Sequence, residues 1–169
     1  MKSANPRLIV FTAFDGMRVL DLTGPLDAFA FTNDLREPGT RAPYMLRVVS
    51  EAGGPLQTSS GLVIATESLA SLDDAEIDTL IAPGGAAALR RGSPPEAAKA
   101  WLAGHARLVS WIAERGPRIR RVCSVCTGTF LLAAAGQLAG HVVATHWASA
   151  ELLAECFPGI RVEPDRIFV

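Results

Sequence analysis

The stretch Arg121-Val-Cys-Ser-Val-Cys-Thr-Gly-Thr-Phe-Leu-Leu-Ala-Ala-Ala-Gly136 decides the fold of this chain. A β-like apolar run leads into Cys126, and a helix-forming run begins at Thr129. Small residues, Ser124 and Gly128, lie two positions before and two positions after the cysteine. This spacing predicts a nucleophile elbow, a sharp strand-to-helix turn whose close backbone approach requires small neighbours. An elbow places the sulfur at a helix N-terminus, where free N–H groups and the helix dipole lower the pKa of a thiol.

The cysteines also allow other interpretations. Cysteine is among the most buried residue types and often serves as a small hydrophobe, which is the interpretation favoured for Cys156 at the end of a predicted helix. Cys123 and Cys126 form a C-x-x-C pattern. A thioredoxin-like dithiol requires the first cysteine at a helix N-terminus, whereas Cys123 falls within the predicted strand. Because no second ligand pair accompanies these residues, the sequence predicts no metal site and no cofactor.

The composition is that of a globular chain large enough for one proper core. Of the 169 residues, 49% are hydrophobic and 20% are charged, and sixteen basic side chains face seventeen acidic ones. These values exclude a disordered chain and lack the electrostatic footprint of a nucleic-acid binder. Three widely placed cysteines argue for a reducing compartment. Residues 1–6 lack the features of a signal peptide and no apolar run has the length of a membrane span, so we expect a cytoplasmic protein.

Apolar, β-rich segments alternate with helix-forming segments along the whole chain. This alternation predicts one α/β domain over residues 1–169, a three-layer sandwich around a mainly parallel sheet. We expect helices from residue 25 up to a loop at 33–43, and over 93–115, 127–135 and 148–157. We expect strands over 8–14, 44–50, 78–82, 119–125, 141–145, 160–163 and 167–169, with a turn at 53–55 and a hairpin-like excursion over 56–66.

Three local features carry further expectations. Pro25 suits the first position of a helix, so Thr23 or Gly24 is expected as the cap. The loop Pro83-Gly84-Gly85 follows a predicted strand at its carboxyl end, the edge at which open α/β sheets bind ligands. Residues 167–169 read as an apolar strand with no helix after it, although termini are usually polar. We therefore expect the chain to be truncated at its C-terminal end.

Four motifs in order along the chain resemble the DJ-1/PfpI superfamily of class I glutamine-amidotransferase-like domains. They are Asp21-Leu-Thr-Gly-Pro-Leu-Asp-Ala-Phe29, Leu80-Ile-Ala-Pro-Gly-Gly85, Ser124-Val-Cys-Thr-Gly128 and Ala144-Thr-His-Trp147. The resemblance covers nearly the whole chain and implies a flavodoxin-like fold. Two branches of the superfamily fit: the N-terminal sensor domain of GlxA-like, AraC-type transcriptional regulators, and isocyanide hydratase. Residues 42–62, 118–121 and 164–169 are more similar to the regulator branch.

The resemblance also implies a site. Cys126 matches the family nucleophile and Asp21 the acidic partner that approaches its sulfur. A protonated carboxyl would stabilise a thiolate, whereas an ionised one would raise the thiol pKa. Taken without the motif, Asp21 is more typical of a turn or capping residue. Glycines of the Gly84-Gly85 loop, with Thr127, are expected to offer backbone N–H groups to an oxyanion or a carboxylate.

One departure from the family pattern bears on the chemistry. Protease-like members carry histidine directly after the cysteine, where this chain has Thr127. His146 is the remaining histidine in the matched motifs and is a candidate ligand-binding residue, although a lone histidine at a strand end is more often structural. Hydrolysis through a Cys–His pair is therefore not expected.

Three functions follow from these expectations. In the regulator branch the domain is a homodimer that senses a small-molecule effector, and DNA is bound only by a C-terminal helix-turn-helix region not included in this chain. This reading makes the domain regulatory, on an enzyme-derived fold. The enzymatic alternative is a hydro-lyase that adds water to an isocyanide through Cys126 and Asp21. A third is an oxidation sensor based on Cys126.

Overall fold

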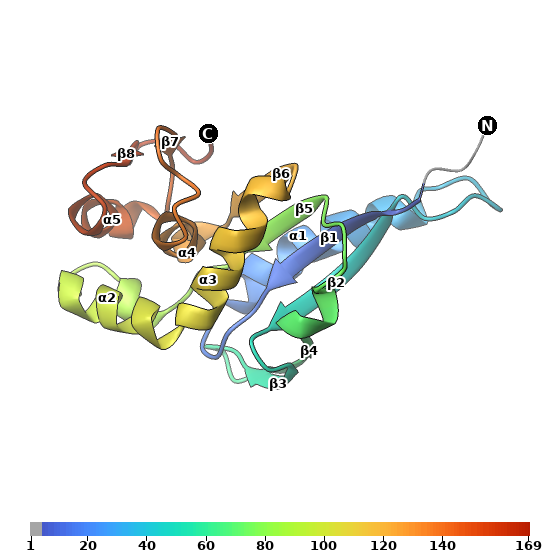
Figure 1. Cartoon of the computed structure of the whole chain (residues 1–169), viewed down its shortest axis with the longest axis horizontal. Coiled ribbons are helices and arrows are strands. Elements are labelled where there is room, and N and C mark those ends of the chain that lie inside the picture. The colour runs from blue at the N-terminus through green and yellow to red at the C-terminus, as the bar shows by residue number, and fades with distance from the viewer. Residues whose placement is uncertain (1–4) are drawn as a thin grey trace.

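A six-stranded sheet forms the centre of the computed structural model, which describes residues 5–169 (Figure 1). The expectation about the N-terminal start therefore lies partly outside the described residues. The strand order is β3-β4-β2-β1-β5-β6. The strands are β1 (Arg7–Thr12), β2 (Tyr44–Ser50), β3 (Gly54–Gln57), β4 (Val63–Ser68), β5 (Thr79–Ala82) and β6 (Arg121–Ser124).

Strand pairing in this sheet is mainly parallel, as the alternation of elements predicts. β1 pairs in parallel with β2 and β5, β5 with β6, and β2 with β4. Only β3 runs antiparallel, to β4, which confirms the expected hairpin, although Gly54 and Pro55 belong to β3 rather than to the turn before it. The consecutive residues Ile9, Val10 and Phe11 of the central strand β1 are all fully buried, so both faces of this strand are covered by other elements.

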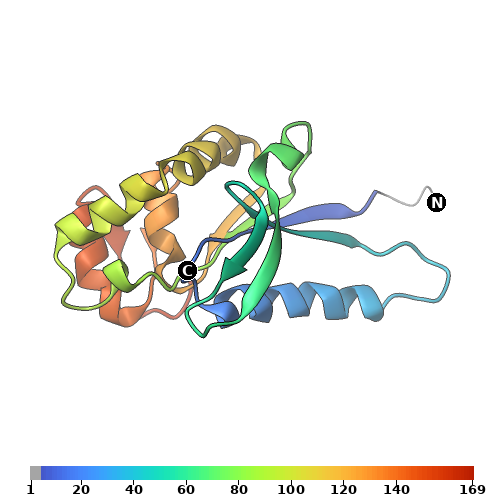
Figure 2. The same cartoon turned by 90° about the horizontal axis from the view of Figure 1, so that it is seen from below.

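Helices cover both faces of the sheet, so the three layers are confirmed. α1 (Val19–Asp34) lies along one face, whereas α3 (Ala106–Arg115) and α4 (Thr129–Ala134) lie on the other (Figure 2). α2 (Pro95–Gly104) and α5 (Ala150–Cys156) pack against each other near one end of the sheet. No helix within the described residues is both long enough and apolar enough to cross a membrane.

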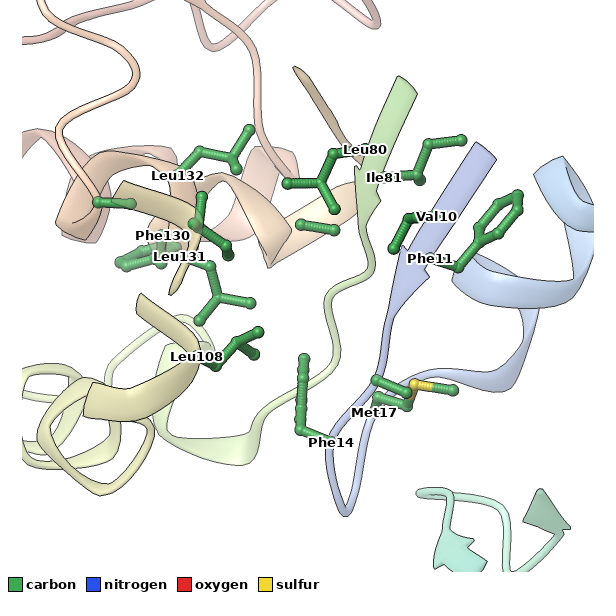
Figure 3. Packing of buried hydrophobic residues seen from close by; sticks show 14 of the residues in the cluster. Val10, Phe11, Phe14, Met17, Leu80, Ile81, Leu108, Phe130, Leu131 and Leu132 are labelled. Atoms are coloured by element: carbon green, nitrogen blue, oxygen red, sulfur yellow. The ribbon is translucent and has the colours of Figure 1, made fainter. Parts of the chain in front are cut away.

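The core lies mainly between the sheet and the α3–α4 layer. Figure 3 shows Phe130, Leu131 and Leu132 of α4 beside Leu108 of α3 and Leu80 of β5. All five side chains are fully or almost fully buried. The run that follows Cys126 is thus an anchoring helix, and its packing fixes the turn that precedes it.

The start of α1 differs from the expectation. The helix begins at Val19, so Pro25 lies inside it and neither Thr23 nor Gly24 is its cap. A proline in a helix lacks one N–H, which leaves only the carbonyl of Asp21 without its partner four residues later, and the fixed φ of proline is compatible with a helix. This correction places Asp21 in the first turn of α1 rather than in a loop.

The helix expected over residues 93–115 is two helices. His105 separates α2 from α3 with φ −112° and ψ 26°. Its ring nitrogen Nδ1 lies 2.9 Å from the carbonyl oxygen of Trp101, and its ring packs edge-on against Phe14 at 5.5 Å. Gly104, a poor helix former, immediately precedes this break. His105 thus has a packing role at the junction of the two helices.

The C-terminal quarter departs most from the expected strands. Within residues 141–145 only Val142–Val143 form a strand (β7), which pairs with β8 (Arg161–Val162) in a separate two-stranded sheet. Residues 167–169 form no strand, and Ile167 is 98% exposed. An apolar run becomes a strand only when a neighbour shares its backbone hydrogen bonds, and no described residue pairs with it.

Candidate active site at the Cys126 turn

Cys126 lies at the sharp turn between β6 and α4. Its φ is +56°, and no other non-glycine residue among the described ones has a positive φ. A 3₁₀ turn, Cys126–Gly128, connects the strand to α4. Any side chain at Gly128 would overlap the carbonyl oxygen of Ala82 at the end of the adjacent strand. This close approach is the reason for the small residue two positions after the cysteine.

The loop after β5 joins α1 to the Cys126 turn. Gly84 donates its backbone N–H to Asp21 Oδ2 at 3.2 Å, and Gly85 donates its own to Thr127 Oγ1 at 2.9 Å. A side chain at Gly84 would overlap the backbone nitrogen and the hydroxyl of Thr127. The N–H groups expected to face a ligand are therefore engaged with the site's own side chains, and a direct role for either glycine or Thr127 in ligand binding stays a prediction.

The pKa of the Cys126 thiol is raised, not lowered. Burial makes the largest contribution, and the negative charge of Asp21 raises the pKa further, as does the hydrogen bond that the thiol donates to this carboxylate. The backbone N–H and the hydroxyl of Thr127 oppose this effect. The expectation of a lowered pKa was thus wrong, because burial and the carboxylate outweigh the donors at the turn.

A cleft of about 930 Å³ opens on another side of Cys126. Its wall includes Thr145, His146 and Trp147, together with residues of β6 and the C-terminal residues 164–169. Asp21, Gly84, Gly85 and Thr127 are not among its lining residues. The residues expected in one pocket are therefore divided between the side that faces the loop after β5, which contains Asp21, and the cleft side, which contains His146.

His146 lines this cleft but makes no hydrogen bond to the sulfur of Cys126 within residues 5–169. Its Nδ1 accepts a hydrogen bond from the backbone N–H of Ala148 at 3.2 Å. The ring stacks on Trp147, with 5.6 Å between the ring centroids. Trp147 belongs to the same quoted motif and was not singled out from the sequence, although it is highly exposed in the cleft.

The other cysteines lie outside the turn itself, although Cys123 also lines the cleft. Cys123 is exposed on the edge strand β6, Cys156 lies at the end of α5, and all three cysteines are free thiols. Burial raises the pKa of both Cys123 and Cys156. Within residues 5–169 the fold brings together no group of three side chains that could hold a metal ion.

The model of the DJ-1/PfpI family matches residues 7–163, which include every candidate site residue. The chain belongs to the DJ-1/PfpI family. Its fold is therefore that of a DJ-1/PfpI domain, as the sequence motifs predict.

Curated relatives of this DJ-1/PfpI domain have different descriptions. An uncharacterised protein in the cpoL 5′ region of Streptomyces lividans is 37% identical over 92% of this chain and 99% of its own length. Isonitrile hydratase of Pseudomonas putida is 32% identical over 86% of this chain and 54% of its own. The HTH-type transcriptional regulator GbdR of Pseudomonas aeruginosa is 28% identical over 94% of this chain and 39% of its own. The chain thus spans about half or less of the length of the two relatives with described functions.

Solved structures show the same fold. A ThiJ/PfpI family protein from Pseudomonas syringae has a TM-score of 0.71 and 27% identity, over 95% of this chain and 58% of that one. An AraC family transcriptional regulator from Pseudomonas putida has a TM-score of 0.72 and 19% identity, over 94% of this chain and 77% of that one. The DJ-1/PfpI fold therefore occurs in regulators as well as in proteins without that description.

Proposed function

We propose that this domain is the ligand-sensing and dimerisation domain of an AraC-family transcriptional regulator. Similarity to GbdR over 94% of the chain supports the proposal. In this proposal a small-molecule effector occupies the cleft beside Cys126, and DNA is bound by a helix-turn-helix region encoded beyond residue 169. Such a regulator acts in the cytoplasm, where its DNA lies.

The state of the Cys126 thiol is the observation that carries this proposal. Burial and Asp21 both raise its pKa, so the thiol is largely protonated near neutral pH. The thiolate is the reactive nucleophile, and a protonated thiol is a poor one. A half-buried thiol with a raised pKa beside an open cleft fits a binding site better than a catalytic one. The same reasoning argues against a peroxide sensor, because oxidation also follows thiolate character.

The coding sequence beyond codon 169 tests the proposal. We expect it to continue into a helix-turn-helix region in the same reading frame. A stop codon shortly after codon 169, with no such region, would overturn the regulator function. In the full-length protein, substitution of Trp147 by alanine in the cleft wall should abolish effector-dependent reporter expression but leave DNA binding by the helix-turn-helix region intact.

Isocyanide hydration is the second candidate, and the bond from the Cys126 thiol to Asp21 favours it. Asp21 can accept the thiol proton as the sulfur attacks the terminal isocyanide carbon, and the returned proton completes a thioimidate. Water then attacks that carbon, which releases an N-substituted formamide and restores the thiol. The relative named isonitrile hydratase supports this candidate.

An aryl isocyanide distinguishes the two candidates. The enzyme would convert it to the N-aryl formamide, which is measured by chromatography, and Cys126→Ala would remove the activity. Turnover no greater than that of Cys126→Ala would rule out the hydratase and leave the binding function.

The homodimer expected for this domain has a candidate surface on α1. Leu20, Gly24, Ala28, Phe31 and Leu35 recur at helical spacing on the exposed side of the helix, opposite the buried side that contains Leu22. A helix that is apolar on both sides is typically covered on both. Small residues at the centre of the stripe allow close approach of a second helix, and large ones at both ends make an antiparallel copy complementary. We propose that a second copy of this chain covers α1.

A further inference from the structure

Three hydroxyl groups connect the Cys126 turn to the wall of the cleft. Thr145 donates from Oγ1 to the carbonyl oxygen of Cys126 at 3.0 Å, across 19 residues of sequence. Thr129 Oγ1 lies 3.1 Å from the carbonyl oxygen of Ala144 and 3.0 Å from Ser124 Oγ. The turn and the segment Ala144–Trp147 are therefore linked by hydrogen bonds in both directions.

Which hydroxyl donates in each of these hydrogen bonds is limited by the number of hydroxyl protons. Each threonine and serine hydroxyl has one proton to donate. Thr129 is closer to Ala144 O than to Cys126 O, which lies at 3.3 Å, so its proton goes mainly to Ala144. Ser124 then donates to Thr129, and Thr145 becomes the principal donor to the Cys126 carbonyl. Loss of the Thr145 hydroxyl would remove that donor and leave only the longer contact of Thr129, whose one proton is shared with Ala144.

This bond acts on the most unusual backbone position of the described chain. Cys126 has a φ of +56°, a conformation that is disfavoured for residues with a side chain and persists where surrounding contacts hold it. A hydrogen bond to the carbonyl of Cys126 restricts rotation of the peptide that follows the cysteine. The rotation of that peptide also positions the Thr127 N–H, which contacts the sulfur.

The cleft wall continues directly from this donor. His146 and Trp147 follow Thr145 in sequence and line the cleft that Cys126 also lines. Their rings stack on each other, and His146 Nδ1 accepts the N–H of Ala148. A displacement of this wall would therefore be transmitted to Thr145 and, through its hydroxyl, to Cys126.

We propose that Thr145 is a positioning residue, whose hydroxyl holds the Cys126 turn so that the sulfur stays against Asp21 and follows the position of the His146–Trp147 wall. This inference rests on the proposed function, because it names the residue through which occupancy of the cleft reaches Cys126. The link between the cleft wall and Cys126 needs no partner molecule, because all of the hydrogen bonds that form it join residues of the described chain.

The test measures alkylation of Cys126 by iodoacetamide against pH. A background of Cys123→Ser and Cys156→Ser leaves one thiol. Thr145→Val removes the hydroxyl at nearly constant shape, so the turn relaxes and the half-buried sulfur moves away from Asp21. The midpoint of the pH profile should fall, because burial and Asp21 outweigh the Thr127 N–H that opposes them. A fall of half a unit corresponds to about threefold faster alkylation near neutral pH. Thr145→Ser, which keeps the hydroxyl, should restore the wild-type profile.

A matched control is Thr32→Val on α1, where the hydroxyl also donates to a backbone carbonyl, that of Ala28 at 2.9 Å. This variant should leave the profile unchanged. If Thr145→Val proves unfolded by circular dichroism, Thr145→Ala at this half-buried position takes its place in the same assay. A folded variant without the hydroxyl whose profile matches that of wild type would overturn the proposal.

The outcome is independent of the proposed function. Alkylation requires neither an effector nor DNA, so a chain that proves to have no helix-turn-helix region would still show the effect of Thr145. Conversely, an unchanged profile would remove Thr145 from the site and leave the regulator function to its own test.

Discussion

Asp21 Oδ2 accepts the backbone N–H of Gly84 at 3.2 Å, which joins the first turn of α1 to the loop after β5 across 63 residues of sequence. The negative charge of the same carboxylate also raises the pKa of the Cys126 thiol. Asp21 therefore has two roles that substitution can separate. One is the backbone bond, which fixes geometry, and the other is the negative charge, which keeps the thiol protonated.

Asp21→Asn should lower the pKa of Cys126. The amide oxygen can still accept the Gly84 N–H, but the negative charge that disfavours the thiolate is gone. Burial remains, so the pKa falls without reaching that of an exposed cysteine. The alkylation profile of Cys126, in the background without the other two cysteines, should shift to lower pH. Asp34→Asn at the other end of α1 is the control, and a midpoint that stays or rises in Asp21→Asn would contradict this account.

Gly84→Ala should destabilise the domain strongly. The added methyl group would overlap the backbone nitrogen and the hydroxyl of Thr127, neither of which can move without disturbing the Cys126 turn. Forced overpacking of this kind costs about 2 kcal/mol or more of unfolding free energy. Chemical denaturation measures the loss. Gly104→Ala, at a position with nothing near the added methyl, should be neutral or slightly stabilising, and equal stability of both variants would refute the close approach.

The sequence predicts the parts of the site that depend on local spacing. The small residues two positions before and after Cys126 predict the turn, because the backbone of a sharp turn approaches its neighbours too closely for large side chains. The start of α1 was placed wrongly because Pro25 is typical of a first helical position, yet one missing N–H inside a helix was tolerated here.

Features that depend on distant segments were not predictable in the same way. The direction in which the pKa of Cys126 shifts depends on how deeply the thiol is buried and on the charge of Asp21. Neither quantity follows from the local sequence. Asp21 was identified through the family resemblance rather than through its neighbours. Thr145 was missed because its partner is a backbone carbonyl 19 residues away. Its adjacency to His146 in the same motif was the only available signal.

The ion pair between Asp78 and Arg120 should contribute stability that disappears in acid. Arg120 donates to both carboxylate oxygens, at 2.6 and 2.8 Å, and these bonds, with help from Thr79 and Arg7, lower the pKa of Asp78 from 3.8 to about 2. Because the pKa of Asp78 is lower in the folded protein, the ionised carboxylate stabilises the fold at every pH above its ordinary pKa. This stabilisation is lost as the pH falls through the folded-state pKa of about 2. The contribution is therefore lost between about pH 4 and pH 2.

Asp78→Asn should lower the free energy of unfolding near pH 6 only modestly, because Arg120 is half exposed to solvent. Urea unfolding of wild type and variant at pH 6 and pH 3 measures the difference, which should shrink at the lower pH. The exposed Asp74→Asn is the control. A difference that is constant with pH would show that the pair does not titrate as described.

Phe31→Glu should abolish the proposed dimer. Phe31 is 60% exposed in the apolar stripe on α1, and a charge there would be buried without a partner in the interface between two copies. Leu62 is 58% exposed but lies outside α1, so Leu62→Glu is a matched control for loss of surface hydrophobicity. Sedimentation at micromolar concentration should find dimers for wild type and Leu62→Glu and monomers for Phe31→Glu. A wild type that is monomeric, or a Phe31→Glu variant that stays dimeric, would show that a second copy does not cover α1.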